Sequence, residues 1–121
     1  MDTRNRNMLS MLSNANKSIA ELIRITEEKK LEDTRTDLEE IHEQMENIIG
    51  NLPKQIYNFK KRDYAELSHR LEDLMKDLEK IFLKIEQYNT GIDGILIMVG
   101  LNKEKNEVER CIYKARSKAN K

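Results

Sequence analysis

One apolar pattern in the sequence is long enough to limit the fold by itself. From residue 64 to residue 99, alternating steps of three and four always reach an apolar or aromatic residue. These positions are Tyr64, Leu67, Leu71, Leu74, Leu78, Ile81, Ile85, Tyr88, Ile92, Ile95 and Val99. A half-buried strand would need an apolar residue at every second position, which this stretch does not have. The pattern therefore predicts a long amphipathic helix that packs on other helices.

Two shorter patterns of the same kind lie upstream. One runs through Leu31, Thr34, Leu38, Ile41, Met45, Ile48 and Leu52, and the other runs through Leu12, Ala15, Ile19, Leu22 and Thr26. Their phases differ, and the change falls at residues 27–30, where an apolar stripe would have to rotate around the helix. We therefore expect a helix over about 8–49, either as one helix with a stutter or as two shorter helices that meet at the phase change.

Breaks in the pattern divide the rest of the chain. Gly50 and Pro53 predict a turn or kink at 50–53, because proline cannot continue a helix without losing a hydrogen bond. Asp63 followed by Glu66 has the spacing of a capping box. The next helix is therefore expected to begin at about 54 or 64.

This long helix is expected to continue to residue 99. Glycines in the segment 89–94 weaken it, so a hinge or a turn at 89–94, where the chain could fold back, is the alternative to a continuous helix. From Leu101 the stripe changes phase again, and a charged C-terminal helix is expected over 101–118. All of these segments belong to a single helical domain, 1–121.

The apolar face of the long helix is wider than the seam of a two-stranded coiled coil. Met75, Phe82 and Leu96 lie beside the heptad positions, which favours bundles of three or more helices. Charged residues make up 36% of the 121 residues, so little apolar area is left for a compact core. The expected fold class is all-α, with long helices forming a helical hairpin or coiled coil that completes a multi-helix bundle with partner chains. A self-sufficient bundle is the alternative.

Charge and hydropathy disfavour several classes of partner. The 22 basic and 22 acidic residues cancel, so no overall field favours nucleic acid. The longest apolar run, 95–99, is far shorter than the roughly 20 residues that span a bilayer. Cys111 is the single cysteine and cannot form an internal disulfide, and the N-terminal residues lack the apolar core of a signal peptide. We therefore expect a cytoplasmic protein without a transmembrane segment.

No pattern of reactive residues predicts an enzyme or a metal site. His42 and His69 have no second histidine or cysteine at helical spacing, so neither forms a metal-binding pair. Neighbouring carboxylates such as Glu39 and Glu40 read as surface charges, and Cys111 lies on or beside an apolar stripe, as a packed cysteine would. We expect no catalytic, cofactor-binding or metal-binding residues and no cofactor.

Two stretches of the sequence resemble a known family. Residues 38–52, together with Ile81-Phe82-Leu83-Lys84-Ile85-Glu86, resemble the cappuccino subunit of the complex for biogenesis of lysosome-related organelles. The run 77–85 is similar to the related KxDL family, although Met75 stands where that motif has lysine. The resemblance implies a non-enzymatic subunit of a rod-like hetero-oligomer that acts in endosomal sorting, with peripheral association with endosomal membranes.

A second resemblance belongs to a different functional class. Tyr57-Asn58-Phe59, then 63–67 and the leucines that follow, look like the BAG domain, a three-helix partner of Hsp70 chaperones. This resemblance implies a co-chaperone whose third helix, supplied by residues 103–121, would face Hsp70.

The expected partners are other helical coiled-coil proteins in a hetero-oligomer, or Hsp70 under the alternative. The residues predicted to form the partner-binding heptad face are Leu38, Ile41, Met45, Ile48, Leu67, Leu71, Leu74, Leu78, Ile81, Phe82, Ile85, Ile92, Ile95 and Val99.

Overall fold

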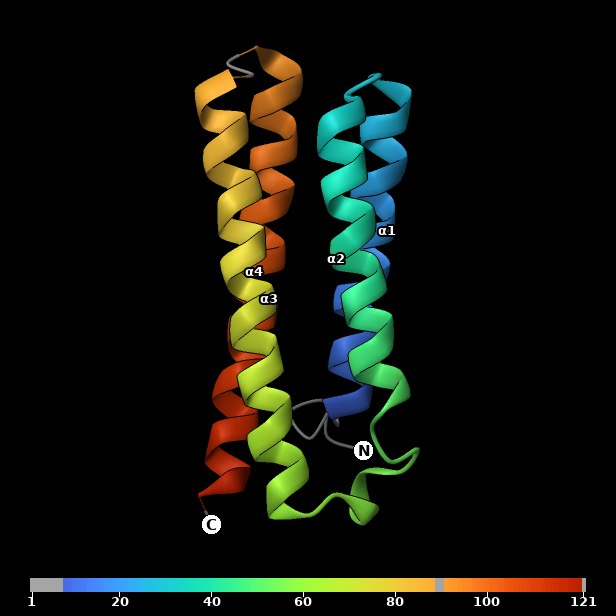
Figure 1. Ribbon diagram of the computed structural model, residues 1–121, viewed down its shortest axis with the longest axis vertical. Helices are drawn as coiled ribbons and strands as arrows, with labels where there is room; N and C mark the ends of the chain where they lie inside the picture. Colours follow the sequence, from blue (N-terminus) through green and yellow to red (C-terminus); the bar gives the residue numbers. More distant parts are fainter. Residues whose placement is uncertain (1–7, 89–90, 121) are drawn as a thin grey trace, which may run out of the picture.

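Four long helices account for most of the computed structural model, which describes residues 8–88 and 91–120. They are α1 (Met8–Glu28), α2 (Glu32–Gly50), α3 (Lys61–Tyr88) and α4 (Ile92–Ala119), with a short 3-10 helix, η2 (Ile56–Asn58), before α3. The helices stand side by side and alternate in direction, so that α1 begins and α4 ends at the same end of the molecule (Figure 1). The predicted all-α class is confirmed, and the chain itself supplies four helices to its bundle.

The four helices form a closed ring of neighbours around one core. Each of α1 and α3 packs against both α2 and α4, and the pair α3 and α4 has the most extensive contact. Every helix turns an apolar stripe with helical spacing toward the centre. The fully buried large side chains are Met8, Leu12, Ile19, Leu38, Ile41, Met45, Leu67, Leu71, Leu74, Leu78, Ile97 and Leu101.

The phase change at residues 27–30 marks a reversal of the chain. α1 ends at Glu28 and α2 begins at Glu32, so residues 8–50 form two helices and not one helix with a stutter. The Leu31 N–H donates to the Thr26 carbonyl at 2.9 Å, and the Lys30 N–H donates to the Glu27 carbonyl at 3.2 Å. This pair of bonds is the Schellman arrangement, in which one residue takes the left-handed conformation. Lys30 is that residue, with φ of 59°.

The start of α3 differs from the predicted start in one respect. α3 begins at Lys61, so Asp63 lies inside the first turn and is not the capping residue itself. Its Oδ2 accepts a hydrogen bond of 2.8 Å from the Lys60 backbone N–H, as the third residue of a capping box does. Glu66, expected to reach back to the helix start, instead pairs with Arg70 at 3.2 Å.

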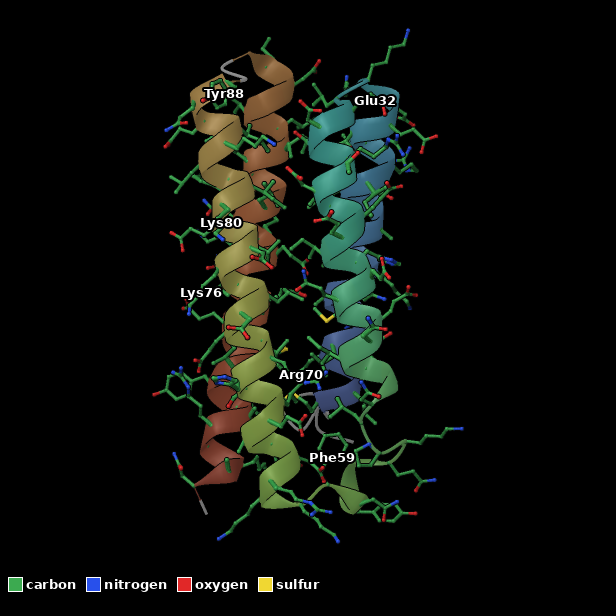
Figure 2. All side chains as sticks on the ribbon, viewed as in Figure 1. Glu32, Phe59, Arg70, Lys76, Lys80 and Tyr88 are labelled. Atoms are coloured by element: carbon green, nitrogen blue, oxygen red, sulfur yellow. The ribbon has the colours of Figure 1, made fainter. Side chains whose placement is uncertain are left out.

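Ion pairs and side-chain hydrogen bonds join the helices at the surface of the bundle. Lys84 Nζ lies 3.2 Å from Asp37 Oδ2 across the seam between α2 and α3. In the same seam the Gln44 amide donates to Asp77 Oδ2 at 3.2 Å. Exposed pairs of this kind contribute little stability singly, about 0–1 kcal/mol. Other charged side chains, such as Lys76 and Lys80 of α3, are exposed (Figure 2).

The left-handed Lys30 yields a prediction about stability. Replacing Lys30 by glycine removes the Cβ that disfavours this conformation, so Lys30→Gly is expected to raise the free energy of unfolding by up to ~1 kcal/mol. Urea denaturation followed by circular dichroism measures this difference. Lys17→Gly, in the exposed interior of α1, is the matched control and is expected to lower stability by about 1 kcal/mol. Loss of stability in both variants would contradict the role assigned to Lys30.

Candidate partner-binding surface

The helix α4 carries an exposed row of aliphatic side chains over its first two turns. These side chains are those of Ile92, Ile95, Leu96 and Val99, which follow each other at the spacing of one helix face. Their exposed fractions are 84%, 55%, 49% and 51%. We call these four residues the α4 stripe. Folded monomers commonly expose single apolar residues, whereas these four side chains form one continuous apolar patch, which makes them the candidate site.

The opposite face of α4 explains why the α4 stripe is exposed. The side chains that α4 turns to the core include Ile97, Leu101 and Val108, and this face stays largely apolar down to Ala115. Continuing the α4 stripe by four and then seven residues leads to Lys103 and Arg110. Burying the α4 stripe within the bundle would therefore bury these two cations as well, at a cost far above the gain from four aliphatic groups.

A glycine brings the first half of α4 close to α1. A Cβ at Gly100 would collide with the end of the Leu22 side chain, so any larger residue there would require Leu22 to shift. Near the same end of the bundle, Lys29 Nζ of α1 lies 3.5 Å from Asp93 Oδ1 of α4. Both contacts occur in the rotation of α4 that leaves the α4 stripe facing outward.

The structure divides the residues predicted to bind partners into three groups. Ten of them are buried in the core of this chain's own bundle: Leu38, Ile41, Met45, Ile48, Leu67, Leu71, Leu74, Leu78, Ile81 and Ile85. Phe82 is half-buried, and the Lys105 Nζ lies 5.0 Å from the centre of its ring. Ile92, Ile95 and Val99 are exposed on α4. Of the fourteen predicted residues, these last three are the ones that another chain can reach without opening the core, and Leu96 lies beside them on the same helix face.

The prediction of one apolar face from residue 64 to residue 99 is wrong for its last part. α3 ends at Tyr88, and α4 begins at Ile92 and runs back along it. Of the predicted hinge segment 89–94, residues 89 and 90 lie outside the described residues. Because α4 is a separate helix, the apolar residues along its whole length determine which side it buries. The side with the longer row of apolar residues faces the core. The sequence feature that indicated a separate helix was the change of phase of the apolar stripe at Leu101.

Within residues 8–88 and 91–120 one charged residue faces the core, and the spacing of apolar residues did not predict it. Glu104 of α4 is 1% exposed, between the fully buried Leu101 and Val108 on the same face. Neither of its carboxylate oxygens has a hydrogen-bond partner among the described residues. Burial, together with the nearby Glu107, raises the pKa of Glu104 to about 8. The carboxyl is thus largely protonated at neutral pH, the form that a dry core tolerates.

The residues considered for chemistry do not gather into a site. His42 Nδ1 lies 3.5 Å from Glu46 Oε1 one turn along α2, and His69 is exposed on α3. Burial, with Glu107 and Glu104 nearby, raises the pKa of the Cys111 thiol to about 12. At neutral pH Cys111 is therefore a protonated, packed side chain and not a nucleophile. Within residues 8–88 and 91–120 no group of three or more His, Cys, Asp or Glu residues is arranged to hold a metal ion.

Comparisons with protein families, with characterised proteins and with solved structures find no match to this chain. Among the helices that the structure describes, none is long and apolar enough to cross a membrane.

Glu104 yields a prediction about the pH dependence of stability. Its pKa in the folded protein, about 8, lies above the ordinary value of 4.5. The stability that the protonated form contributes is therefore fully present below about pH 4.5 and is lost as the pH rises through 8. Between about pH 5 and pH 9 the wild-type protein is expected to lose ~2–4 kcal/mol relative to Glu104→Gln, which cannot ionise.

Urea denaturation across this pH range measures the difference. Glu109→Gln, which removes an exposed carboxylate from the same helix, is the matched control and is expected to follow the wild type at every pH. A constant gap between the wild type and Glu104→Gln would show that Glu104 does not change its charge over this range.

Proposed function

We propose that this protein is a non-enzymatic structural subunit that assembles with other helical chains through the α4 stripe. The observation that carries the proposal is the exposure of Ile92, Ile95, Leu96 and Val99 in one row on a helix that is otherwise well packed. An unpaired apolar row on a rigid helix is the surface that another helix recognises, with anchor residues at spacings of three and four.

The rigid position of α4 supports the proposal. α4 packs on both α1 and α3, and its last turns are held as well, by the ion pair between Arg116 and Glu72 of α3. A helix fixed on two sides presents its free face without the entropic cost of ordering it on binding. The α4 stripe is thus a preorganised binding surface.

The finer part of the proposal concerns the kind of assembly. The resemblance of residues 38–52 and 81–86 to the cappuccino subunit supports a hetero-oligomer that acts in endosomal sorting. In such an assembly the residues buried in the bundle hold the subunit together, and the α4 stripe holds its neighbour. The BAG-like alternative assigns the same helix to an Hsp70 chaperone, so a single experiment distinguishes the two.

The test compares what co-purifies with tagged full-length protein from its native cells. The wild type is expected to recover a small set of helical proteins in near-equal amounts, as identified by mass spectrometry. The double variant Ile95→Asp/Val99→Asp is expected to lose them, because binding would bury two unpaired carboxylates. Both residues are exposed in the free protein, so the variant is expected to keep its fold, as circular dichroism would verify.

The control is Tyr113→Asp, which places one carboxylate at an exposed position on α4 beyond the α4 stripe. It is expected to recover the same proteins as the wild type. Equal recovery by the double variant would show that the α4 stripe is not the binding surface. Recovery of an Hsp70 chaperone that ATP releases would replace the structural-subunit proposal by the co-chaperone alternative.

A further inference from the structure

We infer that the helix covering the α4 stripe is the α4 of a second copy of this chain, packed antiparallel about a two-fold axis between Ile95 and Leu96. This inference rests on the proposed function, because it names the occupant of the same surface.

The spacing of the α4 stripe makes it complementary to itself. An axis between Ile95 and Leu96 places Ile92 of one copy opposite Val99 of the other, and Ile95 opposite Leu96. All four aliphatic residues of each copy therefore meet an aliphatic residue of the other. An isologous contact requires such a match, because both partners contribute the same patch.

Charge selects the antiparallel arrangement over the parallel one. Lys103 and Arg110 continue the side of α4 on which Val99 lies, and both are exposed. In a parallel pair each of these cations would face its own copy, which is unfavourable. In the antiparallel pair the basic half of each α4 extends away from the axis and beyond the contact, so this repulsion does not arise.

Asp93, the acidic residue beside the α4 stripe, does not oppose the pairing of two copies. Asp93 is already paired with Lys29 of its own bundle, at 3.5 Å. The four residues of the α4 stripe carry no charge. A second copy can therefore approach without bringing an unpaired charge into the centre of the contact, where such charges are most costly.

The exposed area fits a weak, reversible dimer. Four aliphatic side chains that are about half exposed or more present roughly 400 Å² per copy, within the size range of the largest apolar patch on a folded monomer, which is often functional. With the neighbouring surface, two copies would bury on the order of 1,000 Å², at the low end for specific protein interfaces. We therefore expect a monomer–dimer equilibrium and not a permanent dimer.

Sedimentation equilibrium of the purified full-length protein tests the inference, over concentrations from about 5 to about 500 μM. The wild type is expected to shift from monomer toward dimer as its concentration rises. Ile95→Asp/Val99→Asp is expected to weaken dimerisation at least tenfold, while the control Tyr113→Asp dimerises like the wild type. A wild type that stays monomeric at the highest concentration overturns the inference, and so does a double variant that dimerises normally.

Disulfide trapping tests the direction of the pairing. The native Cys111 does not interfere, because it is buried and its raised pKa keeps it protonated. Mixing Ile92→Cys with Val99→Cys under mild oxidation is expected to cross-link one variant to the other, since disulfides need Cβ atoms about 4 Å apart. Each variant alone is expected to cross-link poorly. Strong cross-linking of each variant to itself, without cross-linking in the mixture, would overturn the antiparallel arrangement.

The two experiments separate this inference from the proposed function. A monomeric wild type whose helical partners are still lost in Ile95→Asp/Val99→Asp would contradict the second copy and support a different helical occupant. A monomer that recovers no helical partner would overturn both.

Discussion

The structure depends on the burial of one apolar stripe from each of four antiparallel helices in a single core. No one of these stripes is wide enough to form a core alone, because charged residues occupy 36% of the sequence. Four of them meeting at the centre exclude water from a column of leucine, isoleucine and methionine side chains. Every other feature adjusts to this requirement: the chain reverses where a stripe changes phase, and each helix rotates to present its most apolar side.

α4 shows what happens when a helix has two candidate sides. Its first two turns are apolar almost all round, and its later turns are apolar on one side only. Since a helix rotates as a unit, the later turns decide which side is buried. As a result, α4 has the charged residue Glu104 on the side that faces the core and the apolar α4 stripe on the side that is exposed. A buried carboxyl group and an exposed aliphatic row are both unusual in a helical bundle, and here they have a common cause.

Much of the fold could be predicted from the spacing of apolar residues. The stripes through Leu12 to Thr26, Leu38 to Ile48 and Leu67 to Ile85 are the buried faces of α1, α2 and α3. The reversal at Lys30 coincides with a change of phase that the sequence shows. It could not be identified as a turn beforehand, because no glycine, asparagine or proline stands there. A lysine in the left-handed conformation is stabilised by the packing of the helices on either side.

The candidate site was harder to predict than the fold. Ile92, Ile95 and Val99 continue the heptad spacing of α3 without a gap. Periodicity alone therefore cannot distinguish one continuous helix from two helices joined by a turn that preserves this spacing. What decides the matter is which helices α4 contacts. The aliphatic residues of α2 and α3 could not be assigned from spacing either. Their spacing is equally suitable for packing against another chain and for packing against the other helices of the same chain.

The direction of the helices has a consequence for the dimensions of a paired assembly. α1 begins and α4 ends at one end of the bundle, while the α4 stripe lies near the other end (Figure 1). Two bundles joined through their α4 stripes would overlap only at their tips and extend in opposite directions. At 1.5 Å per residue, the two copies of Ala119 would lie about 70 Å apart along the common axis. Anything attached at the ends of the two chains would thus be held at a set separation, and the pair would act as a molecular spacer.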